Sequence, residues 1–163
     1  MKTLYLIRHA KSDWSIGHLS DIDRPLNERG YGDAHKMNLI LKEKKIFPDL
    51  IISSPAVRAI STALIFCRAL NYDPKAVLIN KNLYNTSVKD YLKSISEIND
   101  KHNIVFLFGH NPTITNTANA LTNAMTEEMP TCAIAGMQSD AENWEAFSKN
   151  INGLTYFDIP KNH

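Results

Sequence analysis

Cysteine is scarce in this sequence, and its scarcity excludes two kinds of small protein. The only cysteines, Cys67 and Cys132, lie far apart with no CxxC motif at either, so neither a disulfide framework nor a zinc site is indicated. The six histidines show no HExxH or comparable spacing, and we expect neither a metal nor another cofactor. This cysteine content predicts a location in the reducing cytoplasm.

Long apolar runs and an excess of one charge are also lacking. No run is long enough to cross a bilayer, and the apolar start of the chain meets Arg8 too soon for a signal peptide. Lys and Arg together number 18 against 17 Asp and Glu, a formal charge of +1, so no basic field suggests nucleic acid. We expect contact with neither membrane nor nucleic acid, and any anion site has to be built locally.

The chain does contain an alternation of strand and helix patterns. Its 163 residues are 44% hydrophobic and 21% charged, which predicts one globular domain over 1–163. Period-2 or fully apolar runs predict strands at 3–7, 49–53, 76–79, 104–108, 132–137, 144–147 and 154–159. Helical spacing predicts helices at about 27–45, 55–70, 87–98 and 112–121. The alternation predicts an α/β fold, a three-layer sandwich around a mainly parallel sheet with a possible antiparallel edge.

Two dipeptides predict helix starts, and one loop is unusually long. Ser54-Pro55 and Asn111-Pro112 each combine a capping residue with a proline, and we expect each to start a helix. The polar segment 10–25, which contains Trp14, is long for a structureless connection, and loops of that length are often functional.

Basic side chains stand where three of the predicted strands end. Arg8 and His9 follow the first predicted strand at its end. Arg58 lies in the first turn of the helix after the second strand, and His110 follows the IVFLF strand. The carboxyl ends of parallel strands meet at one edge of a sheet, where ligands bind. Helix N-termini at the same edge add partial positive charge. The pattern predicts a site for a dianion, and phosphate is the obvious one.

The residue types suit phosphoryl transfer. A neutral imidazole such as that of His9 is a competent nucleophile at pH 7. Arg8 and Arg58 each offer a planar fork of donors, and His110, if protonated, would stabilise the same charge. Taken singly, each residue would more often be structural or solvated; their joint placement favours catalysis. The glycine-rich phosphate loops GxxxxGK[ST] and GxGxxG are absent.

Ordered sequence blocks carry a resemblance to a known family. The chain resembles the histidine phosphatase superfamily, which has the phosphoglycerate-mutase-like fold, and within it the small phosphohistidine phosphatase branch, the SixA-like proteins. The matching blocks are LIRHAKS at 6–12, DRPLNERG at 23–30, SSPAVRAISTA at 53–63, FGHNP at 108–112 and PTCAIA at 130–135. RHA alone would be a weak motif, whereas several ordered blocks are specific.

The resemblance implies roles for individual residues. It implies that His9 is the nucleophile that becomes phosphorylated. It implies a surrounding phosphate pocket formed by Arg8, Arg58 and His110. Further substrate-binding residues by the same resemblance are Asp21, Arg24 and Ser12.

One segment departs from the family pattern. Many members supply a carboxylic acid from a Leu-x-Glu-like segment after the third strand, and here the segment 82–86 reads NLYNT, without a carboxylate. Our candidates for the proton donor are Asp21, then Asp23, then His18. For each of them a solvated loop position is the alternative interpretation.

The resulting hypothesis is a metal-independent phosphatase acting through a phosphohistidine on His9. Because an imidazole leaves easily without a strong acid, the missing carboxylate favours phosphohistidine in a protein as the substrate. We expect an open, shallow pocket with His9 exposed at its floor. The alternatives are a phosphomonoesterase for small phosphate esters and a non-catalytic phosphate-binding regulatory module; a mutase is disfavoured by the short chain.

Overall fold

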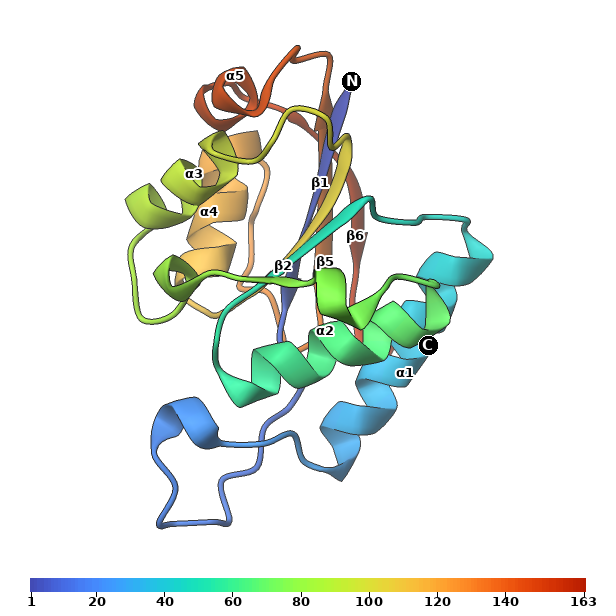
Figure 1. Ribbon diagram of the computed structural model, residues 1–163, viewed down its shortest axis with the longest axis vertical. Helices are drawn as coiled ribbons and strands as arrows, with labels where there is room; N and C mark the ends of the chain where they lie inside the picture. The colour runs from blue at the N-terminus through green and yellow to red at the C-terminus, as the bar shows by residue number, and fades with distance from the viewer.

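A six-stranded sheet forms the centre of the computed structural model, which describes residues 1–163 (Figure 1). Its strand order is β3-β2-β4-β1-β5-β6; β3, β2, β4 and β1 are parallel, and β5 is antiparallel to both of its neighbours. The strands are β1 (Lys2–Arg8), β2 (Leu50–Ser53), β3 (Leu78–Ile79), β4 (Ile104–Gly109), β5 (Ile134–Ser139) and β6 (Gly153–Asp158). The predicted mainly parallel α/β sheet with an antiparallel edge is confirmed.

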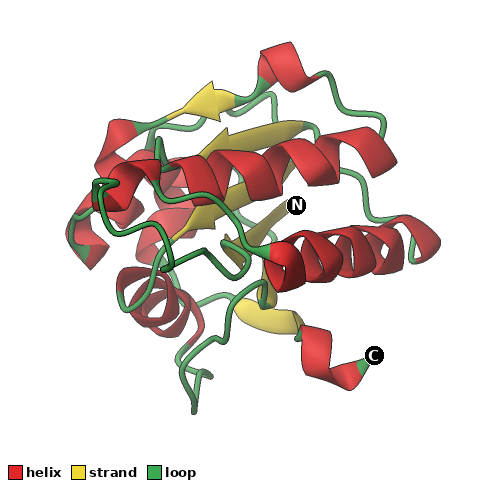
Figure 2. Cartoon of the chain, turned by 90° about the horizontal axis from the view of Figure 1, so that it is seen from below, coloured by secondary structure: helices red, strands yellow, loops and turns green.

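Helices cover both faces of the sheet (Figures 1 and 2). Helices α1 and α2 pack together on one face, and α3, α4 and α5 pack on the other. Their bounds are α1 (Glu28–Glu43), α2 (Val57–Ala69), α3 (Val88–Ser96), α4 (Thr113–Thr122) and α5 (Trp144–Lys149). Short 3₁₀ turns, η1 to η4, lie at Asp21–Asp23, Pro74–Ala76, Lys81–Leu83 and Pro160–Asn162. None of the helices combines the length and the apolar character that crossing a membrane requires.

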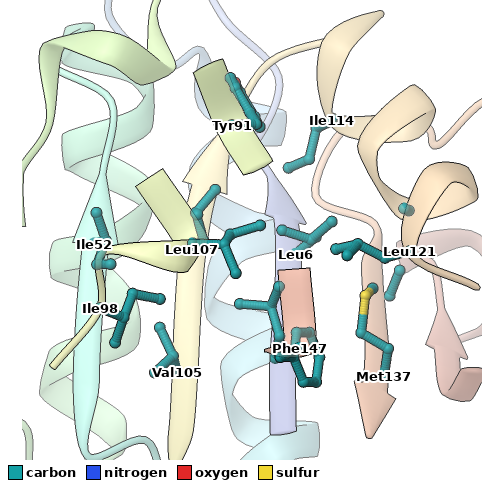
Figure 3. Packing of buried hydrophobic residues seen from close by; sticks show 14 of the residues in the cluster. Leu6, Ile52, Tyr91, Ile98, Val105, Leu107, Ile114, Leu121, Met137 and Phe147 are labelled. Carbon is teal, nitrogen blue, oxygen red and sulfur yellow. The ribbon is translucent and has the colours of Figure 1, made fainter. Parts of the chain in front are cut away.

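The alternation of side chains along β1 divides the core into two layers. Leu4 and Leu6 face the cluster beneath α3, α4 and α5, whereas Tyr5 and Ile7 face the cluster beneath α1 and α2. Figure 3 shows the first cluster, in which Leu6 lies among residues of the neighbouring strands and helices. Because β1 is buried on both faces, its central run from Leu4 to Ile7 is continuously apolar rather than alternating.

The strand ends bring distant parts of the chain together. Arg8 pairs with Gly109 across β1 and β4, and Ser53 pairs with Phe108 across β2 and β4. The residues that follow these positions therefore emerge at the same edge of the sheet. The long segment between β1 and α1 lies below this edge in Figure 1.

The base of that segment is held by backbone contacts. An antiparallel bridge joins Ser12 to Leu26, and the Asn27 N–H donates to the Lys11 carbonyl. Gly30, in the first turn of α1, packs against the Lys11 backbone so closely that a Cβ there would collide with the Lys11 oxygen. A glycine is therefore required where the helix meets the loop.

One predicted element has the wrong type. The segment Trp144–Phe147, predicted as a strand, is the start of α5, and the Asn143 side chain caps it by accepting from the Ala146 N–H. Trp144 and Phe147 are both buried and lie three residues apart, a helical spacing that a four-residue run does not distinguish from a strand. The other elements agree within a few residues; the predicted strands 76–79 and 132–137 begin later, at Leu78 and Ile134.

Both predicted caps are also wrong. Helix α2 begins at Val57 with Ala56 at the N-cap, and α4 begins at Thr113 with Pro112 there; neither N-cap makes a side-chain bond. The Ser54 hydroxyl accepts from the Ala56 N–H and contacts His110. The Asn111 amide donates to the Met129 carbonyl and accepts from the Thr115 hydroxyl. The side chains expected to cap helices are used for tertiary contacts instead.

Two glycines of α1 provide a matched pair for testing the helix–loop contact. Gly32 has open space where a Cβ would lie, so Gly32→Ala should raise the free energy of unfolding by about 0.5–1 kcal/mol. Gly30→Ala should lower it by about 1–3 kcal/mol, because the Lys11 backbone has to move. Urea denaturation of both variants measures the difference. Equal effects of the two substitutions would contradict the close packing at Gly30.

Candidate active site

His9 lies immediately after β1, and both of its backbone groups are bonded. Its N–H donates to the Gly109 carbonyl, and its own carbonyl accepts from the Cys132 N–H, so neighbours on both sides hold it. His9 is only 7% exposed, and the expectation of an exposed His9 at a shallow floor is wrong. The physical reason is that Arg58 of α2 and the His110 ring lie against the imidazole and shield it from solvent.

The hydrogen bonds of His9 define its tautomer. Nδ1 lies 2.7 Å from the Ala10 carbonyl oxygen, which can only accept, so Nδ1 carries the proton. Nε2 then has a free lone pair, and the Arg58 Nε lies 3.4 Å from it as a donor. Burial, assisted by the positive charges of Arg58 and Arg8, lowers the pKa of His9 from 6.5 to about 3. The ring is therefore neutral at pH 7, with the nucleophilic nitrogen facing the arginine.

Two arginines meet beside this nitrogen. Arg58, from the first turn of α2, is buried, and its Nη1 and Nη2 donate to the backbone and side-chain oxygens of Asp21 at 2.7 and 3.0 Å. Arg8 donates from Nη1 to the Met129 carbonyl at 3.0 Å, and its Nε is buried without a partner. An unpartnered buried N–H is costly, so Arg8 Nε is suited to receive an oxygen of a bound anion.

His110 lies next to His9 at the end of β4, with the two ring centroids 5.0 Å apart. Its backbone N–H donates to the Tyr91 hydroxyl, and Nε2 lies 2.7 Å from the Ser54 hydroxyl, while Nδ1 is buried without a partner. Burial first, and then Arg58, lower the pKa of His110 to about 4. The ring is thus neutral before an anion binds, and Nδ1 is a second open position in the site.

Arg24 is held between the loop and the pocket. Its Nε and Nη2 donate to Asp21 Oδ1 at 3.2 and 3.0 Å, and its Nη1 donates to the Ser12 hydroxyl. The Trp14 ring, itself 70% exposed, covers the guanidinium at 3.5 Å. The resemblance-based residues Ser12, Asp21 and Arg24 therefore form one connected group, with Trp14 as its outer cover.

Asp21 is an ionised carboxylate rather than a proton donor. Its Oδ2 accepts from the Tyr84 hydroxyl at 2.7 Å and from Arg58, and its Oδ1 accepts from Arg24. The hydrogen bond from Tyr84, followed by those from the two arginines, holds the pKa of Asp21 well below its usual range. A group with so low a pKa is a poor general acid at neutral pH, which disfavours our first candidate for that role.

The other two proton-donor candidates lie outside the pocket. Asp23 accepts a hydrogen bond from the Ser20 hydroxyl, and both Asp23 and His18 are exposed loop residues. Neither lines the cavity that contains His9. The solvated-loop interpretation therefore describes both of them.

A cavity of about 180 Å³, here called the phosphate pocket, collects the predicted residues. Its walls include Arg8, His9, Ser12, Arg24, Arg58 and His110, so every predicted residue except Asp21 lines it. Sequence reasoning missed Lys11, Asn111 and Thr131 in the wall, and Ser54 and Tyr84 behind it. Ser54 and Asn111 both lie in matching sequence blocks, but the sequence pattern there predicts helix caps rather than site residues.

Three arginines around a buried neutral histidine, at the carboxyl ends of parallel strands, define a phosphate-binding α/β protein. The sequence identifies the class more closely. Residues 4–104 match the family described as the histidine phosphatase superfamily (branch 1), and the chain belongs to that family. It is a phosphatase with the phosphoglycerate-mutase-like fold, in the SixA-like branch.

Several known proteins are similar to the chain. An uncharacterised chloroplastic protein of Arabidopsis thaliana is 30% identical over 152 residues, which covers 88% of this chain and 69% of that protein. Phosphoglycerate mutase 1 of Saccharomyces cerevisiae is 39% identical over 67 residues, but these are 40% of this chain and only 27% of the mutase. The similarity to the mutase is therefore confined to part of each chain.

Solved structures match over nearly the whole length. A protein of Agrobacterium tumefaciens provisionally named phosphohistidine phosphatase SixA has a TM-score of 0.83 and 30% identity, with 98% of both chains covered. The protein histidine phosphatase SixA in complex with tungstate has a TM-score of 0.84 and 23% identity, also with 98% of both chains covered. At its lower identity, the second match bears on the fold alone.

The two buried neutral histidines should make stability depend on pH. Below pH 6.5 the unfolded chain binds protons on His9 and His110 that the folded protein, with pKa values of about 3 and 4, does not bind. The free energy of unfolding should therefore fall as pH drops from about 6.5 to about 4, by about 1.4 kcal/mol per pH unit for each histidine. Denaturation series at pH 6.5, 5.8 and 5.0 in phosphate-free buffer measure this slope. In the double variant His9→Gln, His110→Gln the free energy of unfolding should depend less on pH. An unchanged slope would contradict the neutral state of the two histidines in the folded protein.

Proposed function

We propose that this phosphatase removes phosphate from phosphohistidine in a partner protein, without a metal, through a covalent phosphoryl group on Nε2 of His9. The observation that carries the proposal is the buried neutral ring of His9 in the wall of the phosphate pocket, whose Nδ1 proton is held by the Ala10 carbonyl and whose Nε2 lone pair faces Arg58. The proposal treats residues 1–163 as one domain and places the protein in the cytoplasm.

Phosphoryl transfer then proceeds in two displacements. The Nε2 lone pair of His9 attacks phosphorus, and the electron pair of the substrate's P–N bond departs with the leaving imidazole. Water next attacks the same phosphorus, the P–N bond to His9 breaks, and its electron pair returns to Nε2 as inorganic phosphate leaves. The hydrogen bond from Nδ1 to Ala10 keeps the ring in the same orientation through both steps.

Donors already in the pocket can stabilise the transferring group. Arg8 Nε and His110 Nδ1 are buried and have no partner, and the Arg58 Nε points at the nucleophilic nitrogen. These groups can receive the equatorial oxygens of the phosphoryl group without large rearrangement. Since Arg8 and Arg58 provide the positive charge that a divalent ion would otherwise supply, we infer that no metal is needed.

The choice of substrate depends on whether the site can protonate the leaving group. An alkoxide requires a proton as it leaves, and Asp21, the carboxylate bonded to Arg24 and Arg58, is held in its ionised form by Tyr84 and these two arginines. An imidazole has a pKa near neutrality and leaves with far less help. The 30% identity to the Agrobacterium tumefaciens protein provisionally named phosphohistidine phosphatase supports the same choice.

The covalent step can be trapped. The protein is mixed with a radiolabelled phosphate donor in EDTA and quenched rapidly without acid. A base-stable, acid-labile phosphate should then be found on His9 by peptide mapping. His9→Ala should lose turnover by several orders of magnitude, because a covalent nucleophile has no substitute. Circular dichroism of the variant checks its fold. Near-normal turnover by a folded His9→Ala protein, or dependence on an added divalent ion, would overturn this mechanism.

The leaving group can be tested with two substrate classes. A phosphohistidine protein should show a kcat/KM at least tenfold above those for sugar and glycerate phosphates, because the pocket has no carboxylic acid ready to protonate an alkoxide. The comparison is repeated in Asp21→Asn, which removes the carboxylate but keeps an oxygen acceptor. If esters are the better substrates, and the Asp21 variant harms only esters with poor leaving groups, the protein is a phosphomonoesterase instead.

A further inference from the structure

A second cavity of about 330 Å³ adjoins the phosphate pocket, and we call it the side cavity. The two cavities share Arg58, His110 and Asn111, so a phosphoryl group held by the shared residues faces both. His9 lines only the phosphate pocket. In an in-line displacement the leaving group points away from the nucleophile, and the side cavity, which shares residues with the phosphate pocket but is not lined by His9, offers space for it.

The wall of the side cavity is mostly neutral. Tyr84, Asn85, Thr86 and Thr113 contribute hydroxyl and amide groups, and the charged groups in the wall, Asp21 and Arg58, are paired with each other. No lysine lines the cavity. A leaving group with its own carboxylate or phosphate would find no free cation there, whereas a neutral or cationic polar group would be accommodated.

The hydroxyl of Tyr84 has a fixed direction. It donates its only hydrogen to Asp21 Oδ2 at 2.7 Å, and the same oxygen receives Arg58, so the carboxylate stays ionised and can only accept. The neighbouring carboxylate also raises the pKa of Tyr84, so the phenol keeps this hydrogen at neutral pH. The Tyr84 oxygen can therefore offer a ligand only a lone pair, as a hydrogen-bond acceptor.

A lone pair at this position matches some leaving groups and not others. An alcohol leaving as an alkoxide needs a donor, which Tyr84 cannot provide while its hydrogen is held by Asp21. A phosphorylated imidazole that is protonated on its second nitrogen brings a donor of its own. When its P–N bond breaks, the electron pair stays on the ring, which leaves as neutral imidazole with that N–H intact.

We propose that the side cavity is the leaving-group subsite and that the Tyr84 oxygen is its specificity-determining acceptor, which selects phosphoramidates whose departing ring carries an N–H. This inference rests on the proposed function and adds a residue that distinguishes N–P substrates from esters. Asp21 acts here as a positioning residue: it holds the Tyr84 hydrogen and, through its other contacts, Arg24 and Arg58.

Tyr84→Phe and three small substrates test the proposal. The substrates are 1-phosphoimidazole, 1-phospho-3-methylimidazolium, which has a methyl group in place of the N–H, and p-nitrophenyl phosphate, which has no N–H. Tyr84→Phe should lower kcat/KM for 1-phosphoimidazole by about 10- to 100-fold, the loss expected for one hydrogen bond to a charged group. The other two substrates should change by less than about threefold. Tyr31→Phe, an exposed tyrosine of α1 outside both cavities, is the matched control.

The possible outcomes separate this inference from the proposed function. A selective loss on 1-phosphoimidazole supports the acceptor role. An equal loss on all three substrates would show that Tyr84 acts only by holding Asp21 and Arg58, and an unchanged rate on all three would show that it contacts no leaving group; either result overturns the inference and leaves the phosphohistidine assignment standing. A parent enzyme that turns over neither 1-phosphoimidazole nor a phosphohistidine protein overturns the proposed function itself.

Discussion

The pairing of β1 on both sides is the constraint on which the candidate site depends. The backbone of His9 continues that pairing beyond the strand, bonded to Gly109 on one side and to Cys132 on the other. The backbone of a residue held in this way cannot turn, and the side-chain hydrogen bond from Nδ1 to the Ala10 carbonyl fixes the plane of the ring and the position of Nε2. The direction of the nucleophile is therefore a property of the sheet rather than of the loop around it.

Burial then determines the charge state of the site. His9 and His110 are taken out of water and surrounded by arginines, and both effects favour the neutral rings. The Asp21 carboxylate pairs with both Arg24 and Arg58 and so balances only part of their positive charge. A dianion entering this pocket meets donors that are already oriented, so little of its binding energy is lost in reorganisation.

This arrangement has a cost to stability. Arg8 Nε and His110 Nδ1 are buried donors or acceptors without partners, each of which destabilises the unliganded protein by about 1–3 kcal/mol. The extensive apolar clusters on the two faces of the sheet offset such losses. The anion site therefore destabilises the unliganded protein locally, and the rest of the fold compensates for this.

Much of the site could be predicted from the sequence, because the relevant residues sit at strand ends. A run such as TLYLI followed by Arg8 and His9 specifies both a buried strand and what stands at its end, and the topology of parallel strands then brings the ends together. His110 and Arg58 were predicted for the same reason, and all of these side chains line one pocket. Local patterns predict less well where a short apolar run fits both a strand and a helix, as with Trp144 and Phe147 in α5.

The sequence by itself determined the strand ends and the basic residues placed on them, since both are properties of short contiguous segments. Only the tertiary structure decided the protonation states of His9 and Asp21 and the direction of the Tyr84 hydroxyl. Tyr84 and Asp21 are 63 positions apart in the chain, and Ser54 and His110 are 56 apart. Burial and hydrogen bonding between such distant residues arise only when the chain has folded, and these interactions give each group its chemistry.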